Sequence, residues 1–243
     1  MNNILSVVIP VYNEERFIEE TLKEVISAES GHFKKEIIVV DDCSTDKTVK
    51  HIQSFISKFN KKTSSILIKL ISKKINEGKG AAVKDGFAHT TGDVVIVQDA
   101  DLEYSPHEYS LLLEPFVTSD ADVVYGSRFI SDRPHRVLYF WHSVANHFLT
   151  FLSNILTNLN LTDMETGYKV FRGDLIRKLA PKLQSKRFGF EPEITALISR
   201  VTRLKIYEVG ISYWGRTYAE GKKISWVDGV RALFEILRYN LFR

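Results

Sequence analysis

The chain has 243 residues, of which 44% are hydrophobic and 26% charged, and its formal net charge at pH 7 is +3. A chain of this length and composition can bury a sizeable core within one α/β domain. The charge is too small to indicate a nucleic-acid-binding protein, which usually carries a concentrated basic stripe, and the single cysteine, Cys43, excludes an intramolecular disulfide.

The first hundred residues alternate between short apolar runs and helical patterns. A β-branched strand begins at Ser6 and is expected to end at Pro10, and a helix with one apolar face follows at 17–26. Further strands are expected at 36–40, 66–71 and 94–97. One helix is expected to begin near Lys47, after the second strand, and another to run through Phe87, after the third. This alternation predicts a parallel sheet built from right-handed crossovers.

Two aspartates, Asp99 and Asp101, directly follow the apolar run at 94–97. Residues two apart on a strand point to the same side, and the carboxyl ends of parallel strands are where α/β sheets bind ligands. Both carboxylates can then reach one hard cation, so the spacing predicts a divalent-metal site. A polar turn that closes the strand is the alternative interpretation of the same residues.

The segment Gly78-Lys79-Gly80 lacks the spacing of a phosphate-binding P-loop. The first strand is not followed by Gly-x-Gly-x-x-Gly either, which disfavours a dinucleotide-dependent oxidoreductase. We expect the two glycines to permit a close backbone approach between this loop and the next helix. Lys79 itself fits either a phosphate contact or a solvent-exposed position.

Five motifs in order along the chain resemble the inverting family-two glycosyltransferases with the GT-A fold, and within them the dolichyl-phosphate and polyprenyl-phosphate sugar transferase branch. The motifs are Pro10 to Glu14, Asp41-Asp42-x-Ser44-x-Asp46-x-Thr48, Asn76-x-Gly78-x-Gly80, Asp99-Ala100-Asp101 and Gly126-Ser127-Arg128. The resemblance implies one domain over residues 1–243, with a mostly parallel sheet between two helical layers. It also implies a nucleotide-sugar half at 1–104, an acceptor half at 105–215, and a basic loop with an amphipathic helix at 216–243.

The same resemblance implies a set of donor-binding residues and a Mg²⁺ or Mn²⁺ cofactor. The metal ligands would be Asp99 and Asp101, with Glu103 where relatives supply a third ligand. Arg216 and Lys222 match positions that contact the diphosphate in a late basic loop, although a solvated basic turn has the same composition. The remaining donor contacts implied are Pro10, Tyr12, Glu14, Val39, Asp41, Asp42 and Ala100. Their ordinary alternative is a capped turn with acidic loop residues.

The acceptor determines which residues would do chemistry, and the sequence leaves two acceptors open. Arg128 is the candidate for holding an acceptor phosphate, and a polyprenyl or dolichyl phosphate needs no base because its second pKa is about 6. A saccharide hydroxyl needs a carboxylate to take its proton, for which Asp163 or Glu165 is the candidate. Further acidic candidates that would face the acceptor are Glu191 and Glu193. The assigned catalytic residues are therefore Asp101, Arg128 and Asp163.

Apolar residues recur at helical spacing from 137 to 159, and the other positions of this segment hold no acidic, lysine or arginine side chain. A second amphipathic pattern runs from 227 to 243. The first segment fits a helix in the headgroup region of a bilayer as well as a helix packed on its own domain. Without a signal-peptide pattern or a membrane-spanning run, the expected location is cytoplasmic, in solution or on the cytoplasmic face of a membrane.

The expected reaction is transfer of a hexose from GDP-mannose or a UDP-sugar to a polyprenyl or dolichyl phosphate. Expected partners are that donor, the lipid or saccharide acceptor, and a membrane surface or membrane protein, without nucleic acid. A nucleotidyltransferase would instead need a glycine-rich basic loop directly after the first strand. A non-catalytic nucleotide-binding module is the other class, and replacement of Asp99 or Asp101 by asparagine separates it from an enzyme.

Overall fold

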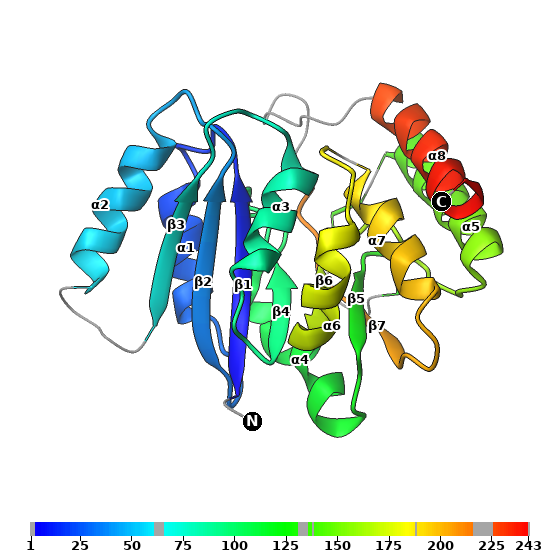
Figure 1. The fold of residues 1–243 in the computed structure, drawn as a ribbon, viewed down its shortest axis with the longest axis horizontal. Coiled ribbons are helices and arrows are strands. Elements are labelled where there is room, and N and C mark those ends of the chain that lie inside the picture. The colour runs from blue at the N-terminus through cyan, green and yellow to red at the C-terminus, as the bar shows by residue number, and fades with distance from the viewer. Residues whose placement is uncertain are drawn as a thin grey trace.

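Apolar β-branched segments build the sheet at the centre of this protein. The computed structural model describes residues 3–60, 66–130, 136–137, 139–187, 189–215 and 226–242. Within them, seven strands pair in the order β3-β2-β1-β4-β6-β5-β7, as Figure 1 shows. The strands are β1 (Ile4–Val11), β2 (Lys34–Asp41), β3 (Leu67–Ser72), β4 (Val94–Val97), β5 (Val123–Ser127), β6 (Lys169–Arg172) and β7 (Ile206–Gly210).

Helices cover both faces of the sheet, so the expected three-layer architecture is confirmed (Figure 1). Helices α1, α2 and α4 contribute to one core cluster, and α3, α6, α7 and α8 contribute to the other. Helix α5 packs against α7 and α8 at the end of the molecule next to β5 and β7. The helices are α1 (Ile18–Ser27), α2 (Thr48–Asn60), α3 (Lys79–Ala88), α4 (Tyr109–Thr118), α5 (Phe140–Thr157), α6 (Gly173–Leu179), α7 (Phe190–Ser199) and α8 (Trp226–Leu241).

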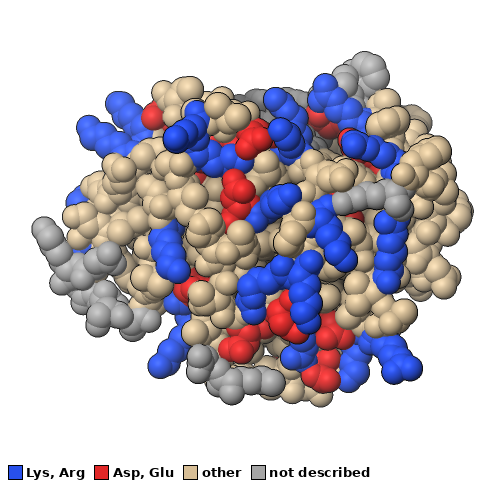
Figure 2. Space-filling model, in the orientation of Figure 1, with Lys and Arg blue, Asp and Glu red and all other residues tan. Residues whose placement is uncertain are grey.

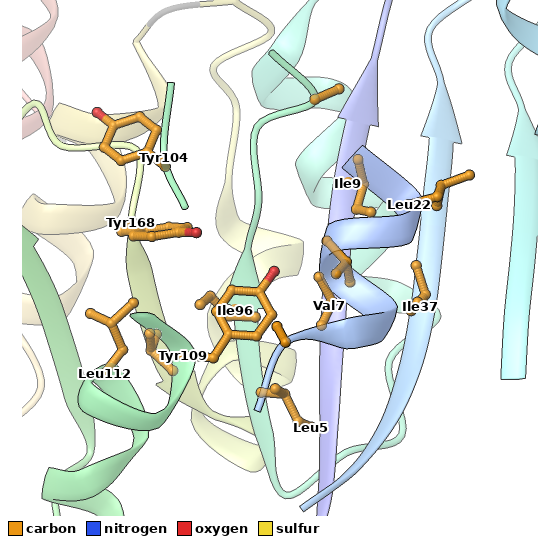
Figure 3. Packing of buried hydrophobic residues seen from close by; sticks show 14 of the residues in the cluster. Leu5, Val7, Ile9, Leu22, Ile37, Ile96, Tyr104, Tyr109, Leu112 and Tyr168 are labelled. Carbon is orange, nitrogen blue, oxygen red and sulfur yellow. The ribbon is translucent and has the colours of Figure 1, made fainter. Parts of the chain in front are cut away.

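Strand alternation divides the core between the two faces. In β1, Leu5, Val7 and Ile9 belong to one cluster, whereas Val8 belongs to the other, as a side-chain period of two requires. Figure 3 shows the first cluster, where Leu22 of α1 and Leu112 of α4 lie over the sheet. Both faces are buried, which explains why the parallel strands appear in the sequence as continuous apolar runs.

The expected strand end at Pro10 is wrong by one residue. Strand β1 continues through Val11, and Pro10 lies opposite Val40 of β2. On its other side β1 pairs with β4 only as far as Val8. With one strand partner left at Pro10, the missing N–H of proline is tolerated there.

Strand β6 runs antiparallel to both of its neighbours, β4 and β5. The sequence did not predict this strand, because four residues give too short a pattern to separate a strand from a loop. Its direction has a consequence for the site, since the start of β6 lies at the same edge as the ends of β4 and β5. The turn before β6 therefore meets the segments that leave those two strands.

Candidate active site

Two acidic segments and one basic segment meet at this edge of the sheet. Asp99 and Asp101 follow β4, Arg128 follows β5, and the segment 163–168 precedes β6. A Cβ atom added to Gly167 would lie 2.6 Å from Asp99 Oδ2, so the turn before β6 approaches Asp99 more closely than any other residue type allows. The antiparallel strand thus joins the two halves of the expected site.

Lys79 is the direct partner of Asp99. Its Nζ lies 2.9 Å from Asp99 Oδ1, 3.0 Å from Asp99 Oδ2 and 3.1 Å from Glu191 Oε1. Burial of Lys79 opposes its charge, but the adjacent carboxylates of Asp99 and Glu191 hold its pKa well above the usual range. Lys79 therefore links α3 to α7 across the site and does not simply face solvent. Its contact with a phosphate stays a prediction.

The predicted three-carboxylate metal set is not assembled. Within the described segments, no group of three or more histidine, cysteine, aspartate or glutamate side chains is placed to hold one ion. Glu103 Oε2 accepts a hydrogen bond from the Tyr213 hydroxyl at 2.7 Å, which directs this carboxylate toward the aromatic ring. Asp101 Oδ1 accepts the backbone N–H of Glu103 at 3.2 Å.

Two carboxylates nevertheless fit the chemistry of Mg²⁺, which proteins usually bind through one or two carboxylates together with substrate phosphates. Both oxygens of Asp99 already hold a cation in this structure, the ammonium of Lys79. Asp101 is partly exposed two residues further on. The donor set of Asp99 and Asp101 is thus suited to a hard cation whose remaining ligands come from a diphosphate and water.

Arg128 and Asp163 form a buried pair. Arg128 Nε donates to Asp163 Oδ2 at 2.6 Å, Nη2 donates to Oδ1 at 2.7 Å, and the Arg128 backbone N–H donates to Oδ2 at 3.1 Å. Burial disfavours the charge of Arg128, but Asp163 beside it raises the pKa of the guanidinium above its already high range. This geometry disagrees with the expectation that Asp163 is a base, because its oxygens already accept three hydrogen bonds.

A column of tyrosines connects the core to the site. The Tyr104 ring packs at a tilt against Tyr168, with 5.0 Å between ring centroids, and against Tyr213, with 5.2 Å. Arg128 lies 5.2 Å from the Tyr213 ring. Figure 3 shows Tyr104, Tyr168 and Tyr109 in this cluster. The sequence indicated no role for them, since aromatic residues are also the commonest filling of a core.

The predicted donor residues around β1, β2 and β4 differ in their burial and contacts. Val39 and Ala100 belong to the buried core cluster, so their side chains pack inside the domain. Asp41 accepts the backbone N–H of Ser44 at 3.2 Å, and Asp42 accepts those of Glu77 and Gly78 at 3.0 and 2.5 Å. These two carboxylates shape the loops that follow β2 and β3. Pro10 and Glu14 are buried as well, whereas Tyr12 is 39% exposed.

The close approach expected of Gly78 and Gly80 is confirmed, but with a different partner. A Cβ atom on Gly78 would lie 2.4 Å from the carbonyl oxygen of Lys186, and one on Gly80 would lie 2.6 Å from that of Ser185. Gly78 also has φ +100°, a conformation that favours glycine. The loop at 185–187 is thereby packed directly on the start of α3.

Three other acidic candidates lie in the described part of the chain, and two basic ones do not. Glu193 does not face the acceptor, because its oxygens accept the backbone N–H groups of Gln184 and Ser185 at 2.7 to 3.0 Å. Glu191 lies near Glu165, and its carboxylate adds to the burial that raises the pKa of Glu165. Arg216 and Lys222 lie outside the described residues.

Lys169 is a buried residue of this site to which the sequence assigned no role. Its Nζ donates to the carbonyl oxygens of Met164 and Thr166 and lies 5.2 Å from the ring of Tyr125. The signal that was available is a lysine at the start of an apolar segment, Tyr168-Lys169-Val170-Phe171. A fully buried lysine requires such partners.

Helix α5 exposes its apolar side. The α5 apolar face, as we call it, consists of Phe140, Trp141, Val144, Phe148, Phe151 and Ile155. Their spacing of one, three or four residues places them on one side of the helix, where Trp141 is 75% exposed and Phe151 62%. Three hydroxyl residues, Thr150, Ser153 and Thr157, are buried on the opposite side. The stripe expected at 137–159 is therefore real, and most of it is not covered by the domain.

Helix α8 continues this surface. It packs against α5 and exposes Val230, Phe234 and Leu241, beside the exposed Arg231 and Arg238. Figure 2 shows mainly uncharged atoms along the edge where Figure 1 places α5 and α8, with basic side chains next to it. Among the helices that the structure describes, none has both the length and the apolar character needed to cross a membrane.

Comparison with known proteins identifies the family. The model of glycosyl transferase family 2 matches residues 6–180. A dolichyl-phosphate beta-glucosyltransferase of Dictyostelium discoideum is 28% identical over 92% of this chain and 69% of its own length. A UDP-N-acetylglucosamine–dolichyl-phosphate N-acetylglucosaminyltransferase of Methanococcus voltae is 25% identical, over 99% of this chain and 97% of its own.

Solved structures support the fold. Glucosyl-3-phosphoglycerate synthase of Mycobacterium tuberculosis, crystallised with Mn²⁺, UDP and phosphoglyceric acid, superimposes with a TM-score of 0.71. The match covers 99% of this chain and 80% of that one, at 19% sequence identity. The GT-A arrangement expected from the sequence is thus confirmed.

Proposed function

Because the chain belongs to glycosyl transferase family 2 and is a glycosyltransferase, we propose that it transfers a hexose from a nucleotide sugar to a polyprenyl or dolichyl phosphate. The relatives from Dictyostelium and Methanococcus are named as enzymes that act on dolichyl phosphate. The observation that carries the lipid acceptor is the uncovered α5 apolar face beside the acceptor half of the site. A donor of GDP or UDP type remains part of the proposal.

The donor would bind at the ends of β1, β2 and β4. Asp99 and Asp101 would hold Mg²⁺ or Mn²⁺, which when bound neutralises charge on the departing nucleoside diphosphate. Lys79 would then be released from Asp99 while it keeps Glu191, its second carboxylate partner. Arg216 and Lys222 remain proposed contacts to the diphosphate.

Arg128 would position the acceptor phosphate. Its Nε and Nη2 each donate a hydrogen bond to the Asp163 carboxylate. The guanidinium is therefore held in one orientation before the acceptor binds. A preoriented cation of this kind contributes to catalysis through positioning and electrostatic stabilisation. A phosphate monoester is already largely ionised at neutral pH, so its oxygen attacks the anomeric carbon without a base, and the configuration inverts.

The α5 apolar face would lie in the headgroup region of a bilayer. An exposed apolar surface of this extent marks an interaction site. Its occupant is argued to be lipid because the face holds no charged residue, while Arg231 and Arg238 of α8 flank it and can meet lipid phosphates. Aromatic residues at the start of α5, Phe140 and Trp141, suit the boundary between headgroups and acyl chains. The cytoplasmic face of a membrane remains the proposed location.

A donor screen tests this function. Purified protein is incubated with GDP-mannose, UDP-glucose and UDP-N-acetylglucosamine in Mg²⁺ or Mn²⁺, and nucleoside diphosphate release is measured with and without polyprenyl phosphate in detergent. Release that depends on the lipid phosphate supports the proposal. Release stimulated only by free saccharides would replace the phosphate acceptor with a hydroxyl acceptor, and no release from any donor would refute the assignment.

A further inference from the structure

The turn before β6 presents a carboxyl group for which the mechanism above has no use. The carbonyl oxygens of Met164 and Thr166 both accept hydrogen bonds from Lys169 Nζ. These two carbonyls flank Glu165, so the buried ammonium fixes the backbone on both sides of it. These hydrogen bonds therefore fix the backbone position of Glu165 at the site.

Among the described residues, the cations near Glu165 all have other partners. Arg128 is bonded to Asp163, and Lys169 is bonded to the two carbonyls. Lys79, on the neighbouring helix α3, holds Asp99 and Glu191.

Glu165 itself has a buried, unsatisfied oxygen. Within the described segments, no ion pair includes Glu165, and its buried Oε1 has no hydrogen-bond partner. The adjacent Thr166 Oγ1 is also buried and unpaired within the same segments. Buried polar atoms of native proteins are normally hydrogen-bonded, so two neighbouring exceptions at the edge of a binding site indicate a ligand contact.

We propose that Glu165 is a neutral carboxyl group that donates a hydrogen bond to the phosphate of the acceptor. This inference rests on the phosphate acceptor of the proposed function. An ionised Glu165 would place a further negative charge beside Glu191 and Asp163 and would repel the phosphate. A protonated carboxyl group removes that repulsion and adds an O–H donor within the electrostatic reach of the Arg128 guanidinium. Glu165 is then a substrate-binding residue and not a base.

The charges around Glu165 favour the protonated form. Burial is the largest cause and the carboxylate of Glu191 the next, and together they raise the pKa of Glu165 above its usual range. Lys169 and Arg128 act in the opposite direction, and Asp163 adds to the increase. Since the acidic neighbours and the burial prevail, deprotonation should occur above the pH range of an ordinary glutamate.

Three variants test the role. Glu165→Gln keeps a hydrogen-bond donor of the same shape without a charge, Glu165→Ala removes the group, and Glu114→Gln changes an exposed glutamate of α4 as the control. With polyprenyl phosphate and an active donor, we expect Glu165→Gln to stay within about threefold of the parent in kcat/KM, and Glu165→Ala to fall roughly 10- to 100-fold. The loss should appear mainly in KM for the acceptor.

The pH dependence supplies a second readout, which the parent protein gives without any variant. For the parent protein, KM for the acceptor should rise as the pH passes the raised pKa of Glu165, whereas Glu165→Gln should show no such rise. A loss of more than about 100-fold in Glu165→Gln would identify a general base and overturn the inference, as would a parent KM that stays flat up to pH 9. The parent protein alone reports on the proposed function, since a lack of lipid-dependent release in the parent overturns both proposals, whereas failure confined to the variants overturns only this one.

Discussion

Arg128 and Asp163 face each other across the ends of β5 and the turn before β6, joined by two side-chain hydrogen bonds of 2.6 and 2.7 Å. Asp163 is fully buried and Arg128 nearly so. The pair fixes the orientation of the guanidinium that we assign to the acceptor. It also occupies the carboxylate that a sequence-based argument would choose as a base.

Replacement of Asp163 by asparagine should therefore destabilise the protein and not only inactivate it. Removing one partner of a buried ion pair leaves an uncompensated charge, at a cost of about 3–5 kcal/mol. The free energy of unfolding from urea titration measures this effect. Asp174→Asn, at an exposed aspartate that pairs with Lys178 only at 3.9 Å, is the control and should change stability by about 0.5 kcal/mol or less. A stable but inactive Asp163→Asn protein would instead support a direct chemical role.

Asp99→Asn and Asp101→Asn should abolish most transfer while the fold is kept. A bound metal ion stabilises leaving-group charge by several kcal/mol, so we expect a decrease of about 100-fold or more. Calorimetric titration with Mn²⁺ and a nucleoside diphosphate should show the loss of metal-dependent binding.

Glu103→Gln is the matched variant for the metal site, because the Glu103 carboxylate is bonded to Tyr213. Its effect on Mn²⁺ affinity should be less than about tenfold, smaller than the effect of either aspartate. An equal loss in all three variants would restore Glu103 as a third ligand.

Glu36, near the start of β2, should make the stability of the protein pH-dependent. This buried carboxylate accepts hydrogen bonds from Ser6, Thr91 and Gly92. Burial acts to raise its pKa, but the hydrogen bonds of Ser6 and Thr91 prevail and lower it below the usual value. A depressed folded-state pKa means that the stabilisation is present above the unfolded-state pKa and is lost as the pH falls through the lowered value.

Glu36→Gln should thus cost about 1.5–3 kcal/mol at neutral pH, the range for hydrogen bonds to a charged group. It should also remove part of the loss of stability in acid, as measured by thermal or urea unfolding between pH 3 and pH 7. Glu29→Gln, at an exposed glutamate after α1, serves as the comparison. Equal pH profiles for the two variants would contradict the assignment.

The α5 apolar face should bind anionic lipid. Phe148→Ser combined with Phe151→Ser should reduce sedimentation with vesicles of phosphatidylglycerol and phosphatidylcholine by about tenfold or more, since each buried aromatic side chain contributes roughly 1.5–3 kcal/mol. The thermal stability should not fall, because both rings are exposed in the folded protein. Val117→Ser on α4 has a similar exposure on another surface and should leave vesicle binding unchanged. Binding that survives the double substitution would exclude this face.

Local pattern was sufficient for the elements of the first hundred residues. The strands at β1 to β4 and the helices between them were predictable because parallel strands buried on both faces are continuous apolar runs, and each is followed by a polar turn. The pair Asp99 and Asp101 was recognisable for the same reason, since its meaning depends only on its position at a strand end. The later strands β6 and β7 were not predicted, because short strands give weak periodicity.

Contacts between distant segments could not be inferred in this way. The antiparallel direction of β6 brings Asp163 to Arg128 and Glu165 to Glu191, and helix α7 brings Glu191 to Lys79. The amphipathic pattern at 137–159 was visible in the sequence, but an apolar stripe has the same spacing whether it packs on a core or lies exposed. Only the packing of α5 shows that the stripe is uncovered. Residue type and spacing thus established which groups are present and on which elements, whereas their charges and roles depend on burial and on neighbours far away in the chain.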